Sequence, residues 1–507
     1  MTSLPQTLPA LFAPDADAEP ALEAPGRLPL GFGGLRRLAT ATAEALNARG
    51  IGCRDRVAIV LPNGPEMAAA FLTIATAAAT APLNPAYRAD ELEFYLGDLA
   101  PKALVVEAGS DGPARAVAER QGIAVLDLVA DAAGPAGSFT LRGAGGSPVA
   151  GGAAAADDVA LLLHTSGTTS RPKLVPLSQR NIAASAQHIA RTLELGPADR
   201  CLNIMPLFHI HGLIGAVLAS MAAGGSVVCT PGFNALKFFA WLEDTAPTWY
   251  SAVPTMHQAI LGRAGRNAEI IARRRLRLIR SSSASLPAPV MAELESVFGC
   301  PVLESYGMTE ASHQMTGNPL PPRPRKPGTV GVAAGPEVTL MDEDGRLWPP
   351  RGIGEVVIRG ANVTAGYVNN PAANAAGFRD GWFRTGDQGS FDADGYLTIT
   401  GRLKELINRG GEKVSPLEVD AVLLAHPAIA QAVTFALPHA KLGEEVAAVI
   451  VLREGHSASE RDLRDFAATR LADFKVPRKV VFVDEIPKGA TGKLQRIGLA
   501  AKLGLTA

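Results

Sequence analysis

Short apolar runs alternate with longer Ala- and Leu-rich stretches along most of the chain. The short runs are rich in Val, Ile and aromatic residues and predict strands, while the longer stretches predict helices. Such alternation is typical of α/β layers built around largely parallel sheet. We therefore predict an α/β fold for this part of the protein. The strand and helix candidates are, in chain order, 56–61 and 65–80, 225–230 and 234–245, and 249–253 and 254–261.

The pattern changes near residue 390. A hairpin-like segment, FDADGYLTITGRLKELI, has turn residues at Asp394-Gly395 and leads into shorter strands and two helices. This α+β pattern has the length of one small domain. We expect a large multi-sheet domain over residues 1–403 and a small α+β domain over residues 404–507, and the sequence leaves open whether residues 1–25 are ordered. The helix candidates are 416–425 and 459–471, the strand candidates 276–279, 432–437, 446–452 and 479–483, and the irregular connection 129–157.

Composition narrows the functional classes. A chain of 507 residues exceeds one ordinary domain of ~100–200 residues. Lys+Arg (48) nearly balance Asp+Glu (49), which argues against nucleic acid or a polybasic membrane surface as partner. The four cysteines form no CxxC pair, so neither a zinc site nor a disulfide scaffold is indicated. The chain also lacks a basic leader and an apolar run of ~20 residues, which predicts a cytoplasmic protein without stable membrane insertion.

The segment LLLHTSGTTSRPKLVPLSQRN, residues 161–181, is the most specific motif. Hydroxyls, backbone N–H groups beside a glycine, and cations are what a loop needs to hold a polyphosphate. The spacing is not that of a Walker loop, and composition alone leaves a Ser/Thr-rich surface turn equally open. Besides Arg171, the candidate phosphate ligands are Thr165, Ser166, Gly167, Thr168, Thr169, Ser170 and Lys173.

The run TSGTTSRPK resembles the phosphate loop of the adenylate-forming superfamily, which includes acyl-CoA synthetases, nonribosomal adenylation domains and firefly-type luciferases. Four further matches follow in the family's order across about residues 50 to 496. They are SYGMTE at 305–310, GWFRTGD at 381–387, GRLKELINRGGEKVSPLEVD at 401–420 and PKGATGKLQR at 487–496.

The resemblance implies a two-step reaction. A carboxylate attacks the α-phosphorus of ATP to give an acyl-adenylate and pyrophosphate, and a thiol then displaces AMP. Both reacting groups are anionic, so the site must supply cations. By resemblance, Glu310 and Thr165 hold Mg²⁺, a hard cation that prefers oxygen ligands.

Further nucleotide contacts are implied by the same motifs. Tyr306 would stack on adenine, the SSSAS run would approach the purine and the acyl pocket, and Asp387 with Arg402 would bind the ribose hydroxyls. The residues assigned to ATP or AMP in this way are Ser283, Ala284, Ser285, Tyr306, Gly307, Met308, Thr309, Asp387 and Arg402.

The small domain would carry the mobile catalytic group. By resemblance, Lys493 bridges the carboxylate and the α-phosphate during adenylation and stabilises the charge of the transition state. Family behaviour implies that this domain rotates between the two half-reactions about a hinge at Lys404. Rotation would bring Arg409, Gly410 and Gly411 to the pantetheine of coenzyme A.

The acid is the least constrained part of the prediction. Candidate pocket residues lie beside the motifs: His209 and His211 in MPLFHIHG, residues 253–257, Ser283 and His313. Imidazole and hydroxyl donors suit a second carboxylate, which burial without a partner would penalise heavily. At finer grain, five features resemble the oxalate–CoA ligase branch of the family: Ser170-Arg171 in the phosphate loop, NPAYRADELEFYL at 84–96, FHIHGLIGAVLAS at 208–220, WYSAVPTMHQAIL at 249–261 and MTEASHQMTGNPLPPRPRKPGTVG at 308–331. This resemblance implies that Ser283 and His313 contact the distal carboxylate of oxalate. His209 is a further pocket candidate from its own motif.

Three alternatives stay open at this stage. One is a medium-chain, aryl or malonyl-CoA synthetase, for which an apolar tunnel or a wider pocket would be needed. Another is an adenylating enzyme that does not use CoA and loads a carrier protein or acts as an oxygenase. The third is a non-catalytic interaction module, which the joint presence of Glu310, Asp387, Arg402 and Lys493 disfavours.

Overall fold

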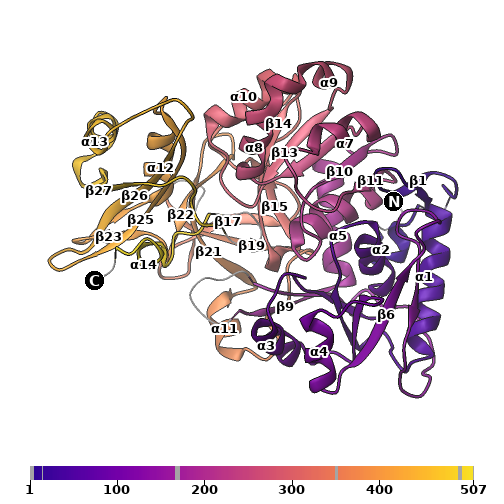
Figure 1. The fold of residues 1–507 in the computed structure, drawn as a ribbon. Coiled ribbons are helices and arrows are strands. Elements are labelled where there is room, and N and C mark those ends of the chain that lie inside the picture. The colour runs from indigo at the N-terminus through magenta and orange to yellow at the C-terminus, as the bar shows by residue number, and fades with distance from the viewer. Residues whose placement is uncertain (1–4, 14, 166–171, 349–351, 489–493, 506–507) are drawn as a thin grey trace.

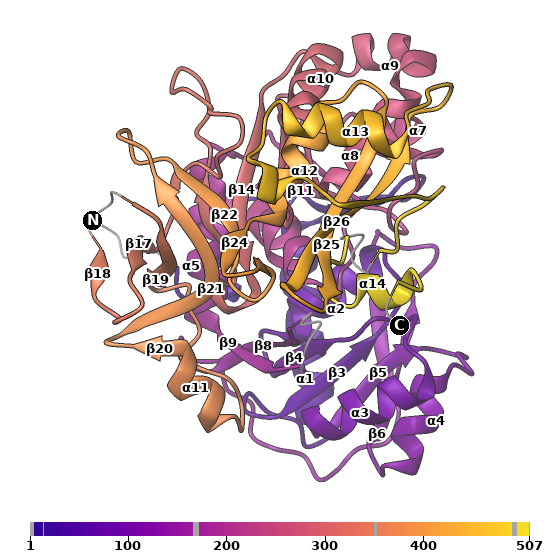
Figure 2. The ribbon, with the colours of Figure 1, turned by 90° about the vertical axis from the view of Figure 1, so that its left-hand side faces the viewer.

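The computed structural model describes residues 5–13, 15–165, 172–348, 352–488 and 494–505. Figure 1 shows a large body formed by the first four fifths of the chain, with the C-terminal elements in gold against one side. In Figure 2, where that side faces the viewer, β25, β26 and α14 lie in front of the large body. The fold is α/β with several sheets, as the sequence predicted.

One sheet of the large body contains, within the described residues, seven strands in the order β7-β6-β5-β3-β4-β8-β9. Its central strands are parallel and joined by helices, so both faces are covered and the strands read as continuous apolar runs. The strands are β3 (Arg56–Val60), β4 (Ala79–Pro82), β5 (Ala103–Glu107), β6 (Ala124–Ala130), β7 (Phe139–Arg142), β8 (Val159–His164) and β9 (Leu174–Ser178).

A second sheet has nine strands in the described part of the chain, in the order β16-β15-β14-β13-β12-β10-β11-β1-β2. Strands β10 to β14 are parallel, and β14 turns back into the antiparallel β15. The strands are β1 (Pro20–Glu23), β2 (Leu30–Gly31), β10 (Arg200–Asn203), β11 (Ser226–Cys229), β12 (Trp249–Ala252), β13 (Leu278–Ser282), β14 (Val302–Met308), β15 (His313–Gly317) and β16 (Val332–Ala333).

Helices fill the space between the two sheets and cover their outer faces. Between them lie α2, α5 and the π-helical segment η2, all of which contact strands or helices of that layer. The helices α3 and α4 cover the first sheet, and α7 to α10 cover the second. The bounds are η1 (Pro9–Leu11), α1 (Phe32–Asn47), α2 (Pro65–Ile74), α3 (Ala89–Leu99), α4 (Pro113–Arg120), α5 (Gln179–Thr192), η2 (His211–Leu218), α6 (Ala219–Ala222), α7 (Phe238–Thr245), α8 (Pro254–Ala264), η3 (Gly265–Asn267), α9 (Ala268–Arg273), α10 (Ala288–Phe298) and η4 (Thr309–Ala311).

Two smaller sheets complete the chain. Strands β17 to β22 form a largely antiparallel sheet beside α11, and β23 to β27 form the sheet of the C-terminal part. The bounds are β17 (Glu337–Met341), β18 (Leu347–Trp348), β19 (Gly354–Arg359), α11 (Pro371–Gly377), β20 (Phe378–Arg379), β21 (Trp382–Phe391), β22 (Leu397–Arg402), β23 (Ile407–Arg409), β24 (Glu412–Val414), α12 (Pro416–Leu424), β25 (Ile429–His439), β26 (Gly443–Leu452), α13 (Glu460–Ala468), η5 (Asp473–Lys475), β27 (Lys479–Phe482) and α14 (Leu499–Lys502).

Two sequence predictions are wrong in detail. The helix expected over 65–80 ends at Ile74, because residues from Ala79 form a central strand whose pairing overrides the helix propensity of alanine. The connection expected over 129–157 contains β7, whose Phe139 and Leu141 are buried in strand alternation. Residues 20–23 near the N-terminus also form a strand, paired with β11.

All four cysteines are unpaired in the structure. None of the helices in the described ranges has the length and apolar content that crossing a bilayer requires.

Candidate active site

The phosphate-loop motif connects the antiparallel strands β8 and β9, and its base is closed by two hydrogen bonds. The backbone N–H of Thr165 donates to the carbonyl oxygen of Lys173 at 2.9 Å, and the N–H of Lys173 donates to Thr165 Oγ1 at 3.1 Å. The predicted ligands Ser166, Gly167, Thr168, Thr169 and Ser170, and Arg171, lie outside the described residues. Ser178, at the end of the motif, caps α5 by accepting the N–H of Asn181.

Lys173 is linked to Glu310 through an aromatic ring. The ammonium of Lys173 lies 4.5 Å from the ring centroid of Tyr367, a cation–π distance. The hydroxyl of Tyr367 donates to Glu310 Oε1 at 2.8 Å. Asn374 of α11 fixes the backbone of Tyr367 with reciprocal hydrogen bonds of 2.7 and 3.0 Å. The structure therefore brings Thr165, Lys173 and Glu310 together through a tyrosine that sequence reasoning missed.

Glu310 is a buried carboxylate in η4, immediately after β14. Burial raises its pKa, while the Tyr367 hydrogen bond and the charges of Lys173 and Arg402 oppose that rise. A single carboxylate fits Mg²⁺, which takes one or two carboxylates together with substrate phosphates and water. Among the described residues no cluster of three metal-ligating side chains competes with it.

Tyr306, Asp387 and Arg402 form a second group. The Tyr306 hydroxyl donates to Asp387 Oδ2 at 2.5 Å, and Arg402 Nε donates to Asp387 Oδ1 at 2.9 Å. Asp387 and Arg402 are register partners on β21 and β22, so the ladder itself positions the ion pair. Burial and the Asp387 charge raise the pKa of Tyr306, and the same carboxylate raises the pKa of Arg402. The group presents a buried, oriented carboxylate.

The SSSAS run continues from β13 into a strained turn. Ser281 and Ser282 are buried in the strand, while Ser283 has a φ of 75°, a left-handed conformation rare outside glycine. Ala284 and Ser285 are exposed. On β14, a Cβ at Gly307 would meet the carbonyl oxygen of His313, so only glycine allows this approach. Met308 pairs with His313, and Thr309 begins η4.

A cluster of polar side chains, all buried except the half-buried Ser283, lies where η2 meets the second sheet. The imidazole of His211 bonds Ser283 Oγ through Nδ1 at 3.1 Å and Ser251 Oγ through Nε2 at 2.6 Å. The ring of His313 stacks on His211 with centroids 4.8 Å apart. His211 is the first residue of η2, a π-helical segment. Segments of this kind are frequent at functional sites. We call His211, Ser251, Ser283, His313 and Arg280 the polar cluster.

Arg280 closes the polar cluster from the centre of β13. Its Nη1 donates to His313 Nε2 at 3.0 Å and to Ser251 Oγ at 3.3 Å, and its Nη2 donates to Gln314 Oε1 at 3.1 Å. A Cβ at Gly215 would lie 2.5 Å from His313 Cδ2 and 3.2 Å from Arg280 Nη1, so the backbone of η2 packs directly on these side chains.

Two other histidines predicted to line the acid pocket, His209 and His257, lie at the edge of the polar cluster or outside it. His209 Nδ1 accepts the backbone N–H of His211 at 3.3 Å, which places it at the edge of the polar cluster. His257, within the predicted wall 253–257, bonds Tyr250 on the opposite face of the sheet. Burial lowers the pKa of His257 to about 3, consistent with a neutral core histidine.

The predicted CoA residues form a tight turn between β23 and β24. Arg409 Nε donates to Glu445 Oε1 at 2.5 Å, and Gly410 and Gly411 have φ values of 60° and 98°. Lys404 is exposed between β22 and β23. Lys493 lies outside the described residues. Its neighbour Arg496 is held by Asp420 Oδ2 at 2.5 Å.

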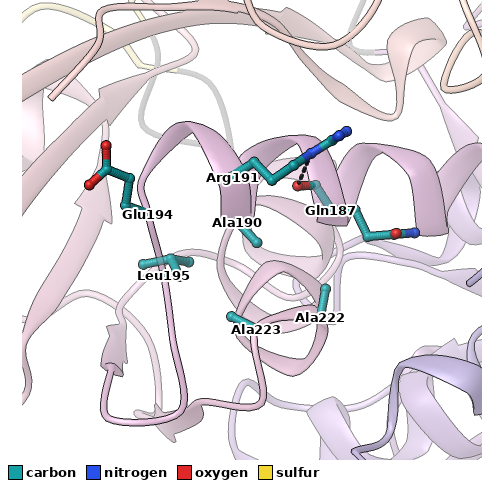
Figure 3. Close-up of a pocket in the computed structure, with 7 residues that line it drawn as sticks. All are labelled: Gln187, Ala190, Arg191, Glu194, Leu195, Ala222 and Ala223. Carbon is teal, nitrogen blue, oxygen red and sulfur yellow. Dashed lines mark hydrogen bonds between the residues drawn. The ribbon is translucent and has the colours of Figure 1, made fainter. Parts of the chain in front are cut away.

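A separate hollow of about 390 Å³ lies between the ends of α5 and α6. Figure 3 shows its lining residues, where Arg191 bonds the backbone of Gln187 and Glu194 points elsewhere. These side chains do not converge on a common point, and none was predicted to bind substrate.

We compared the sequence and the structure with those of known proteins. The profile of the AMP-binding enzyme family matches residues 17–368, and that of the AMP-binding enzyme C-terminal domain matches residues 418–493. The chain belongs to the AMP-binding enzyme family. It is 46% identical over 464 residues to an oxalate–CoA ligase of Arabidopsis thaliana, covering 90% of each chain. A second oxalate–CoA ligase, from Saccharomyces cerevisiae, is 45% identical, with 87% of this chain and 86% of that protein covered.

Among solved structures, the chain resembles an o-succinylbenzoate coenzyme A synthetase from Bacillus subtilis in complex with ATP and magnesium ion. The TM-score is 0.82 and the identity 30%, with 97% of this chain and 98% of that chain covered. The likeness confirms the predicted multi-sheet α/β fold and the resemblance to adenylate-forming enzymes.

Proposed function

We propose that this family member is an ATP-dependent acid–CoA ligase whose acid is oxalate. The observation that carries the proposal is the similarity to two oxalate–CoA ligases along nearly the whole chain. The polar cluster supports the choice of acid, because imidazole, hydroxyl and guanidinium groups suit a small dianion. Ser283 and His313, with His209 at the edge, are the proposed contacts to its distal carboxylate.

In the first half-reaction, a carboxylate oxygen of the acid attacks the α-phosphorus of ATP and pyrophosphate leaves. Thr165, Lys173 and the loop between them hold the phosphates, and Asp387 with Arg402 orients the ribose next to Tyr306. Glu310 and Thr165 would hold Mg²⁺, which supplies positive charge against the phosphate oxygens. Lys493 is the proposed group that stabilises the reacting oxygens.

In the second half-reaction, the thiol sulfur of CoA attacks the acyl carbon and AMP leaves. We propose that residues 404–507 rotate about Lys404 to present Arg409, Gly410 and Gly411 to the pantetheine. Arg409 is held by Glu445, an ion pair within the same sheet, so it can move with that part of the chain.

The test is a ligase assay with ATP, Mg²⁺ and CoA and a panel of oxalate, malonate, octanoate and coumarate. We expect oxalate to give the highest kcat/KM, with AMP and oxalyl-CoA formed in equal amounts. Equal activity on octanoate would refute the choice of acid. AMP release that continues unchanged without CoA would refute the proposal that the protein is a CoA ligase. It would favour an adenylating enzyme of another kind.

A further inference from the structure

Arg280 is a charged residue in the middle of a sheet. It lies in β13 between Ser251 of β12 and Leu303 of β14, and its side chain is fully buried. Buried guanidinium groups are normally paired with carboxylates, because removing an isolated charge from water costs several kcal/mol. The partners of Arg280 therefore indicate what the charge is for.

All the hydrogen bonds from Arg280 go to neutral acceptors. These are the hydroxyl of Ser251, the ring nitrogen of His313 and the amide oxygen of Gln314, and Nε has no acceptor among the described residues. No carboxylate in the described ranges forms an ion pair with it. Burial lowers the pKa of Arg280 to about 9, which still leaves the guanidinium protonated at neutral pH. Within the part of the chain that the structure describes, this interior positive charge is therefore uncompensated.

The charge sits directly behind the proposed acid contacts. Because His313 Nε2 accepts from Arg280, the neutral ring carries its proton on Nδ1. Ser251, the other shared acceptor, bonds His211, which bonds Ser283. Arg280 therefore bonds one proposed contact to the distal carboxylate, His313, directly. It reaches the other, Ser283, through Ser251 and His211.

We propose that Arg280 is the positioning residue that makes the site select acids with a second anionic group. It orients His313 and Ser251 and supplies the positive potential that the second carboxylate offsets on binding. The proposal rests on the proposed function and extends it: the preference for a dianion comes from a charge that does not touch the acid. A purely structural arginine would instead affect all acids equally.

Matched acids separate these two roles. Oxamate has the shape of oxalate with a neutral amide in place of one carboxylate, and malonamate relates to malonate in the same way. The comparison uses R280Q, which keeps hydrogen bonding without charge, and R280K, which keeps the charge without the guanidinium fork. Arg277, three residues earlier and paired with Asp199 at 2.9 Å, provides the control R277M.

The measurement is kcat/KM for AMP release with oxalate and with oxamate. We expect R280Q to lower the value for oxalate about 100-fold or more while changing that for oxamate only a few-fold. R280K should retain most of the preference, and R277M should lower the melting temperature without changing the ratio. Equal losses for both acids in a folded R280Q would overturn the proposal.

Three further outcomes are decisive. If R280Q does not fold, R280K decides, and complete loss of the preference in folded R280K would overturn a role for charge. A wild-type enzyme that prefers malonate to oxalate contradicts the acid proposed above, and Arg280 is then judged on malonate against malonamate. A wild type that prefers neither dianion to its amide refutes both proposals.

Discussion

The hydroxyl of Tyr367 donates to Glu310 Oε1 at 2.8 Å while its ring supports the ammonium of Lys173. One side chain thus orders both the proposed metal-binding carboxylate and the proposed phosphate-binding cation. Because the donor favours the charged form of Glu310, it lowers a pKa that burial raises.

Replacing Tyr367 by Phe should move the acid limb of activity to higher pH. Without the hydroxyl, the pKa of Glu310 rises further, so the carboxylate is protonated over a wider range at low pH. We expect the rate of pyrophosphate release to fall about tenfold at pH 6 and less at pH 8. Y396F is the control, since Tyr396 bonds the carbonyl of Pro324 instead. Superimposable pH profiles for Y367F and wild type would contradict the assignment.

Asp387→Asn should weaken ATP binding more than it slows the chemistry. Asp387 receives donors from Tyr306 and Arg402, and an amide NH₂ facing them would lose one hydrogen bond and the ion pair. We expect KM for ATP to rise about 10- to 100-fold with a smaller change in kcat. D392N removes an exposed charge paired with Lys326 and should leave KM unchanged. A D387N enzyme with normal KM for ATP would exclude Asp387 from the nucleotide site.

His313→Ala should raise KM for oxalate more than KM for a monocarboxylate. The ring stacks on His211 and accepts from Arg280, so its loss removes the link between the buried charge and the acid. H257Q alters a histidine on the other face of the same sheet and should affect stability alone. An unchanged ratio of the two KM values in H313A would remove His313 from the distal-carboxylate site.

Lys493→Ala should abolish adenylate formation and leave thioester formation from supplied acyl-adenylate largely intact. A lysine that stabilises charge only during adenylation has no part in the second displacement. Single-turnover assays of each half-reaction measure the two effects. K502A, which removes another lysine near the C-terminus, bonded to Gln495, should change neither rate. Equal loss of both half-reactions would refute the role.

Glu304→Gln should make the stability of the protein less dependent on pH between the ordinary pKa of Glu304, 4.5, and its raised pKa of about 8. Burial raises the pKa of Glu304 from its ordinary 4.5 to about 8. Between these values the folded state holds a proton that the unfolded chain has released, so stability falls as pH rises through this window, on the order of 1 kcal/mol per pH unit. Glutamine can still accept the N–H of Leu286.

Thermal melts from pH 5 to pH 9 test this expectation. The melting temperature of E304Q should gain on wild type as pH increases, and E293Q, at an exposed position on α10, should follow wild type throughout. Parallel curves for E304Q and wild type would show that Glu304 titrates normally.

The sequence predicted the parallel strands well, because they depend on short, continuous apolar patterns. The nucleotide roles of the motif residues stay predictions. The strand expected over 249–253 is found as β12, and Asp387 and Arg402 meet as register partners. Lys493 and the loop after Thr165 remain predictions, since they fall outside the described residues.

Other contacts could not be predicted because they join distant segments. Tyr367 reaches Glu310 across 57 residues, and Arg280 reaches His313 across 33. An arginine in the central strand LIRSS, β13, was the one available signal, since a charge in a central strand needs a reason. The helix predicted to Thr80 was wrong for a related reason. The alanine content of 75–80 favours a helix locally, but pairing of β4 with the distant β3 overrides this preference, and that pairing exists only in the folded sheet.

The close packing at Gly215 links the size of the proposed acid pocket to its charge. Glycine is already the smallest residue, so change at this position can only remove space beside His313 and Arg280. On this side, extra room for a longer acid would have to come from the polar side chains themselves. A variant that accepts bulkier acids by this route would therefore also lose the proposed preference for a second anionic group, so selection by size and selection by charge would change together.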